Sequence, residues 1–166
     1  TVIPKVDDFP VPINKQKVQK FMGIINYYRG HIFNLASIAA PLYELIKKVK
    51  FQWGESQQRA FKELKQKFKE RMVLAPLKQS GTFALYTDAS GVAIGAVLMQ
   101  DDKPVECFSR TLTPVEQRYS THERESLAMV AAIMHFKNIL LGVHFVVHSD
   151  HKPLKQWFER PPTNER

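Results

Sequence analysis

The chain has 166 residues, which is enough for one ordinary domain or for a domain with a small helical addition. Hydrophobic residues make up 44% and charged residues 24%, values typical of globular proteins that exclude wholesale disorder. The formal net charge of +8 favours a polyanionic partner, with nucleic acid first and an anionic membrane surface second.

Cysteine usage and hydropathy exclude further classes of protein. Cys107 is the only cysteine, so neither an intrachain disulfide nor a cysteine-rich zinc site can form, and an intracellular setting fits. No apolar stretch reaches the ~20 residues of a membrane span, so no membrane partner is expected. The start at Thr1 and the end in "RPPTNER" suggest that both ends were cut from a longer protein.

Helical periodicity dominates the first part of the chain, after a proline-containing lead-in. Residues 14–32 predict an amphipathic helix with a basic flank, and residues 40–50 predict a second helix with Pro41 in its first turn. A third helix follows residues 51–56. The side chains expected to face inward are Val18, Phe21, Met22, Ile25, Tyr28 and Ile32, then Leu42, Leu45, Ile46 and Val49, and then Ala60, Phe61, Leu64 and Phe68.

Strand patterns begin at Thr82. Residues 82–88, 92–99 and 103–109 predict three successive strands joined by turns at 90–91 and 101–103. A helix capped by Ser120 and Glu123 comes next, with its inward residues expected at Leu127, Val130, Ala131 and Met134. A fourth strand at 144–150 and another helix from His151 complete the pattern. The order β-β-β-α-β-α predicts an α/β fold, a mixed sheet with helices packed on it, preceded by a small helical region.

Three acidic residues stand at positions that this fold would bring together. Asp88 closes the first strand, Glu125 lies one turn into the long helix, and Asp150 closes the fourth strand. Converging carboxylates repel one another unless a cation is shared, and oxygen ligands suit Mg²⁺. Two such ions can activate a water and stabilise the leaving oxygen of a phosphodiester. Each acid also has a simpler interpretation: Asp88 as a turn residue, Glu125 as a solvated helix charge, and Asp150 as an N-cap.

At these residues the sequence resembles the Pol polyprotein of gypsy-class LTR retrotransposons. "FMGIINYYRGHIFNLASIAAPLYELIKK" resembles the reverse transcriptase thumb, and "FQWGESQQRAFKELKQKF" resembles the connecting segment. "LYTDASGVAIGAVLMQ", "FSRTLTPVEQRYSTHERESLAMVAA" and "HSDHKPL" resemble the ribonuclease H domain, in the same order. The resemblance divides the chain into a thumb-like segment 1–50, a connection 51–80 and a ribonuclease H-like domain 81–166 that lacks its C-terminal strand and helix.

The resemblance implies cleavage of the RNA strand of an RNA/DNA hybrid with two Mg²⁺ ions, for which Mn²⁺ substitutes. It assigns catalytic and metal-binding roles to Asp88, Glu125 and Asp150. The family's fourth acidic ligand lies on a later helix, beyond Arg166. The Tyr-x-Asp-Asp motif of the polymerase palm is absent, so no DNA synthesis is expected from this chain.

Nucleic-acid contacts are predicted for basic side chains, because a hybrid is held chiefly through its phosphates. The predicted contacts are Lys15, Lys17, Lys20, Arg29, Arg110 and His151, although lysines on a polar helix face are commonly only solvated.

Two alternatives to a nuclease stay open at this stage. The chain could bind nucleic acid without cutting it, or it could be a domesticated interaction fragment whose open sheet edge pairs with a partner, including a second copy. The other expected partners are the rest of the Pol polyprotein, namely palm, fingers and integrase. The expected location is intracellular, in a cytoplasmic virus-like particle or in the nucleus.

Overall fold

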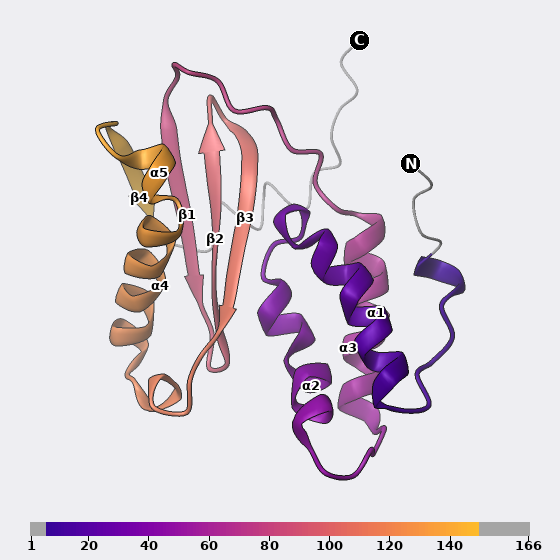
Figure 1. Cartoon of the computed structure of the whole chain (residues 1–166). Helices are drawn as coiled ribbons and strands as arrows, with labels where there is room; N and C mark the ends of the chain where they lie inside the picture. Colours follow the sequence, from indigo (N-terminus) through magenta and orange to yellow (C-terminus); the bar gives the residue numbers. More distant parts are fainter. Residues whose placement is uncertain (1–5, 150–166) are drawn as a thin grey trace.

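The computed structural model describes residues 6–149 and begins with helices, followed by a sheet (Figure 1). The predicted order of three helices and then β-β-β-α-β is confirmed, whereas the helix expected from His151 lies outside the described residues. The elements are α1 (Lys15–Tyr27), α2 (Leu35–Lys47), α3 (Glu55–Lys69), β1 (Phe83–Ala89), β2 (Ala93–Gln100), β3 (Lys103–Thr111), α4 (Thr121–His135), α5 (Lys137–Leu140) and β4 (Phe145–His148), with short 3-10 turns at Val6–Asp8, Arg29–His31 and Glu116–Arg118.

The four strands form one mixed sheet in the order β3-β2-β1-β4. β1, β2 and β3 pair antiparallel, while β4 pairs parallel to β1, so the expected neighbourhood of the first and fourth strands is confirmed. The turn between β2 and β3 contains only Asp101 and Asp102, with φ of 49° and 60°. Asp tolerates this left-handed conformation, which matches the twist of a tight hairpin.

α4 begins as predicted but buries a different face. Ser120 accepts from the backbone of Glu123, whose side chain accepts from the backbone of Ser120, so the expected capping box is confirmed. The prediction that Val130 and Met134 face inward is wrong: they are 59% and 62% exposed. Ala128 and Ala132 are buried instead, because small side chains let the helix approach the sheet closely.

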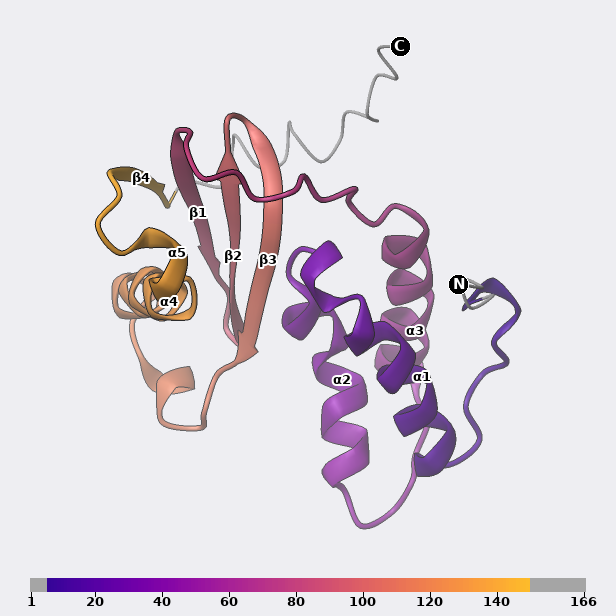
Figure 2. The same ribbon diagram turned by 45° about the horizontal axis from the view of Figure 1, so that its top comes forward.

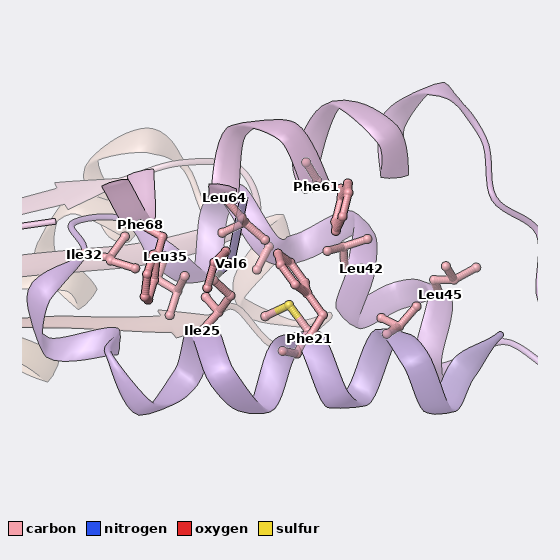
Figure 3. Packing of buried hydrophobic residues seen from close by; sticks show 14 residues of the cluster. Val6, Phe21, Ile25, Ile32, Leu35, Leu42, Leu45, Phe61, Leu64 and Phe68 are labelled. Atoms are coloured by element: carbon pink, nitrogen blue, oxygen red, sulfur yellow. The ribbon is translucent and has the colours of Figure 1, made fainter. Parts of the chain in front are cut away.

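The helices α1 to α3 share one hydrophobic core (Figure 3). Every inward position predicted for the third helix is buried, and so are most of those for the first. Tyr28 is only half-buried, and Ile32 is buried beyond the end of α1. Phe21 lies at the centre, with its ring 5.3 Å from Phe9 and 4.8 Å from Phe61 between centroids. Tight aromatic packing of this kind is a main source of core stability.

The boundaries predicted for the second helix are wrong. α2 begins at Leu35 and ends at Lys47, so Pro41 lies inside the helix and Val49, expected to face inward, is 97% exposed beyond its end. The residue before α2, Asn34, has a left-handed φ of 56° and does not cap the helix with its side chain. Asn is a common residue at a helix start, but its usual side-chain cap is absent here.

The two parts of the chain pack against each other. α2 contacts β2 and β3 on one face of the sheet, whereas α4 contacts β1 and β2 on the other (Figure 2). We call residues 6–72 the helical region and residues 83–149 the sheet region. Within these described parts of the chain, we find no helix that is both long and apolar enough to cross a membrane.

Candidate functional site

Asp88 lies on the face of the sheet that meets the helical region. Alternate strand residues face opposite sides. Leu85 packs in the cluster that contains the buried side chains of α4, while Tyr86 packs with Phe33 and Met72. Asp88 follows Tyr86 in this alternation and is half-buried. Its Oδ2 accepts a hydrogen bond from Nδ2 of Asn34 at 2.9 Å.

Glu125 lies on α4, which packs on the opposite face of the sheet, near the end where Asp88 lies. It lies near the start of that helix, just before Leu127 and Ala128. Those two side chains belong to the same small cluster as Ala89, the neighbour of Asp88. The structure therefore places the two carboxylates on elements that meet at one end of the sheet.

The third predicted acid, Asp150, lies outside the described residues, as does His151. β4 ends at His148 and runs parallel to β1. Between residues 6 and 149, no group of three His, Cys, Asp or Glu side chains could hold a metal ion. Carboxylate oxygens are the donors that Mg²⁺ prefers, so the chemistry of Asp88 and Glu125 fits that ion, but the described part supplies only two predicted ligands.

Hydrogen bonds join the helical region to the sheet region around Asp88. The backbone N–H of Ala36 donates to Oγ of Ser109 at 3.1 Å, and Nη2 of Arg29 donates to the Ser109 carbonyl at 2.9 Å. The hydroxyls of Ser37 and Ser90 are 3.2 Å apart. Sequence reasoning missed this interface, because bonds that span 53 to 80 positions leave no local pattern.

Gly95 makes the close approach of Asn34 possible. It is the register partner of Asp88, and a Cβ at this position would stand 2.3 Å from Oδ1 of Asn34. Gly95→Ala is expected to displace the Asn34 side chain and to lower the free energy of unfolding by about 1–3 kcal/mol. Denaturant unfolding measures this change.

The matched control is Gly23→Ala in α1, where nothing lies within 4 Å of the added Cβ. This change is expected to raise the free energy of unfolding by roughly 0.5–1 kcal/mol, because alanine favours the helix. Equal effects at Gly95 and Gly23 would contradict the close contact with Asn34.

Arg110, a predicted nucleic-acid contact, is paired inside the chain. Its Nη1 and Nη2 donate to the two carboxylate oxygens of Glu116 at 2.8 and 3.1 Å. This side-chain bond, followed by the backbone N–H of Thr113, lowers the pKa of Glu116 from its ordinary value of 4.5 to about 2. The same bond raises the pKa of Arg110. A paired guanidinium offers less positive charge to a phosphate.

The Arg110–Glu116 pair predicts a pH dependence of stability. Because the folded pKa of Glu116 is depressed, its contribution is complete above about pH 4.5 and is lost as the pH falls toward 2. Melting temperatures measured from pH 7 to pH 2 should therefore fall less steeply below pH 4.5 in Glu116→Gln than in the unchanged chain. If the melting temperature falls equally with pH in both proteins, the pair contributes nothing to the loss of stability in acid.

The other predicted basic contacts lie on or near α1. Lys17 and Lys20 are exposed on this helix, and Nζ of Lys15 donates to the carbonyl of Lys48. A separate hollow of about 440 Å³ has polar side chains along its wall, including Arg29 of the predicted contacts. Its lining consists of Asn26, Arg29, Ala36, Tyr43, Ile46, Lys47 and Thr111.

Two lysines of α3 contact the start of the described chain. Nζ of Lys65 donates to the carbonyls of Asp7 and Phe9 at 3.1 and 2.6 Å, and Lys69 pairs with the Asp7 carboxylate at 3.1 Å. These contacts hold the lead-in against the helix. Part of the positive charge of the helical region is therefore engaged within the chain.

Cys107 has no role in this site. It is buried on β3, and burial raises the pKa of its thiol above the ordinary value. A buried, protonated thiol is a poor nucleophile and a poor metal ligand.

Comparison with solved structures supports the fold. The foamy viral protease-reverse transcriptase in complex with an RNA/DNA hybrid has a TM-score of 0.75 and 20% identity, over 92% of this chain and 22% of that one. Its complex with double-stranded DNA gives 0.75 and 19%, over 98% and 35%. At this identity the likeness concerns the fold alone.

Sequence comparison gives relatives among mobile elements. The Pol polyprotein of the Drosophila melanogaster transposon 297 is 37% identical over 92% of this chain, and that of transposon gypsy is 35% identical over 92%. The Tf2-3 polyprotein of Schizosaccharomyces pombe is 33% identical over 99%. The chain spans only 15%, 16% and 13% of these relatives, respectively.

A family match covers the middle and later parts of the chain. The family described as the RNase H-like domain found in reverse transcriptase matches residues 53–147, which include α3, β1 to β3, α4, α5 and all but the last residue of β4. This match agrees with the mixed sheet and confirms the resemblance to retrotransposon Pol polyproteins. The chain therefore belongs to the family of RNase H-like domains found in reverse transcriptases.

Proposed function

We propose that this chain is part of a reverse transcriptase that cleaves the RNA strand of an RNA/DNA hybrid by two-metal hydrolysis. One observation carries the proposal: Asp88 on β1 and Glu125 on α4 belong to elements that meet at one end of the sheet. β4 runs parallel to β1, and in the sequence Asp150, the third acid of the proposed set, comes two residues after the end of β4. A solved relative in fold is a reverse transcriptase in complex with an RNA/DNA hybrid, which supports this choice of substrate.

In this proposal Asp88, Glu125 and Asp150 hold two Mg²⁺ ions, for which Mn²⁺ substitutes. Such ions, when bound, lower the pKa of a water and stabilise the leaving oxygen of a phosphodiester. Asp88 is suited to this role because a strand fixes a carboxylate more rigidly than a loop does. The chain's own contribution is to hold its carboxylates in place and to orient the hybrid.

Binding of the hybrid is assigned to basic side chains of both regions. Arg29 and Lys47 line the hollow between α1, α2 and the end of β3, where two cations suit a backbone phosphate. Lys17 and Lys20, both exposed on α1, are further proposed contacts. Lys15, Arg110 and His151 complete the proposed set of contacts, and Arg110 would act beside its partner Glu116.

The proposed partners and location follow from the relatives. Because the chain spans about one-sixth of them or less, the rest of the polyprotein, with palm, fingers and integrase, is proposed as its surroundings. Pairing of two copies through a sheet edge is a further proposal, since β3 and β4 are the outer strands of the described sheet. An element that copies RNA into DNA would work inside the cell, in a cytoplasmic virus-like particle or in the nucleus.

The test compares metal-dependent cleavage on matched nucleic acids. This chain, and the reverse transcriptase that carries it, are incubated with an RNA/DNA hybrid labelled on the RNA strand, in Mg²⁺, in Mn²⁺ or in EDTA. Cleavage of the hybrid with either ion is expected, while a DNA duplex and single-stranded RNA of the same sequence stay intact. No DNA synthesis is expected from this chain alone.

A second candidate function is binding without cleavage, for the chain in isolation. It is favoured by the formal net charge of +8 and by the exposed Lys17 and Lys20 on α1, which suit a polyanionic partner whether or not it is cut. Salt-sensitive binding of the hybrid by this chain, without cutting, would support it. If the whole reverse transcriptase does not cut the hybrid either, the nuclease is refuted.

A further inference from the structure

Asn34 departs from the ordinary behaviour of a residue at a helix start. An Asn in this position usually accepts a hydrogen bond from a backbone N–H of the first turn. The side chain of Asn34 makes no such bond to α2, and its Nδ2 instead donates to Oδ2 of Asp88, 54 positions away. Its backbone has a φ of 56°, in the left-handed region that Asn adopts more readily than most residues other than glycine.

The sheet region supplies the cap that Asn34 does not provide. The backbone N–H of Ala36, the second residue of α2, donates to Oγ of Ser109 on β3 at 3.1 Å. Ser109 accepts from the Ala36 N–H in place of an Asn34 cap. The Asn34 amide can therefore donate to Asp88 while the first turn of α2 keeps a hydrogen-bond partner. This arrangement depends on the contact of α2 with the sheet, because both Asp88 and Ser109 belong to strands.

The space beside Asp88 is shaped for this amide. Gly95 pairs in register with Asp88, and its missing side chain admits Oδ1 of Asn34 to 2.3 Å from the position that a Cβ would take. The Asn34 side chain thus lies against two neighbouring strands at once. Its orientation is set by the packing on Gly95 and by the bond to Asp88.

We infer that Asn34 is a positioning residue for Asp88, supplied by the helical region, that fixes the carboxylate for metal binding. The inference rests on the proposed function, in which Asp88 is a metal ligand. A carboxylate accepts several bonds, so a donor on Oδ2 is compatible with ligation by the same group. Groups that orient a metal ligand in this way raise metal affinity, and their removal costs about 10–100-fold.

The first measurement is Mn²⁺ binding to this chain, without nucleic acid. Asn34→Gly removes the amide while keeping a residue that adopts the left-handed backbone without strain. Ser37→Ala is the matched control, because it removes the Ser37–Ser90 contact of the same interface and keeps the amide of Asn34 that donates to Asp88. We expect the dissociation constant for Mn²⁺ to rise about tenfold in Asn34→Gly and to stay unchanged in Ser37→Ala.

The second measurement separates positioning from folding in the whole reverse transcriptase. Asn34→Gly is expected to lower kcat for hybrid cleavage about tenfold, to leave KM for the hybrid unchanged, and to recover activity at high Mg²⁺. A merely structural role would lower the melting temperature in both variants without shifting the Mg²⁺ dependence of Asn34→Gly.

The outcomes separate this inference from the proposed function. If Asp88→Asn weakens Mn²⁺ binding and Asn34→Gly does not, the metal site stands and the role of Asn34 is refuted. Tighter binding in Asn34→Gly would refute it as well, since the amide would then compete with the metal. If Asp88→Asn itself binds Mn²⁺ like the unchanged chain, the proposed metal site fails, and the positioning role fails with it.

Discussion

Replacing Asp88 with Asn is expected to slow cleavage of the RNA strand by roughly 10³-fold, because several kcal/mol of transition-state stabilisation depend on the metal ions. Asn keeps the shape of the side chain, and its oxygen can still accept the bond from Asn34, so the fold should survive. Single-turnover cleavage of a labelled hybrid by the whole reverse transcriptase measures the loss. Hybrid binding, measured in parallel, should persist because phosphate contacts dominate affinity.

The matched control is Asp102→Asn, which removes the same charge from the turn between β2 and β3. Asp102 is exposed and has a φ of 60°, a conformation that Asn adopts readily. Its cleavage rate should equal that of the unchanged protein. Equal rates for both variants would remove Asp88 from the metal site and leave the proposed mechanism without its first ligand.

Truncating Phe21 to Ala is expected to lower the free energy of unfolding by about 3–5 kcal/mol, the usual cost of removing a buried aromatic ring. Phe21 is fully buried, and its ring packs against those of Phe9 and Phe61. The surrounding side chains come from three helices, so the cavity cannot close without moving one of them. Chemical denaturation followed by circular dichroism gives the change.

Tyr27→Ala makes the same kind of truncation on the same helix, but its ring is 82% exposed. Its effect should stay within about 0.5 kcal/mol, as is usual for a surface position. A loss as large as that of Phe21→Ala would mean that Tyr27 is buried in solution, against the packing described above.

The sequence predicted the strands well because each carries its own local signal. The alternation of 82–88 and the apolar run of 92–99 yielded β1 and β2 within one residue at each end. α3 was equally clear, since Phe61, Leu64 and Phe68 recur at helical spacing between charged residues. Where the pattern is local and unambiguous, the spacing of apolar residues is enough to predict a strand or a helix.

The sequence failed where tertiary contacts override the local pattern. α4 is apolar on several sides, so spacing alone could not decide between Val130 and Ala132 as the buried position. The start of α2 was predicted too late because Pro41 was assigned to the first turn of the helix, whereas it lies inside α2. Of the candidate site, the sequence supplied Asp88 and Glu125, but it gave no sign of Asn34, Ser109 or Gly95 as their surroundings.

The shared core of the three helices bears on where this protein can be divided. The family match begins at residue 53, between α2 and α3, yet α3 packs its apolar face against α1 and α2. A fragment that starts at that boundary would leave Phe61, Leu64 and Phe68 without the partners that cover them, and exposed apolar patches of this kind favour aggregation. The smallest part worth producing for biochemistry therefore begins upstream of α1, because the start of the family match at residue 53 is not the boundary of independent folding.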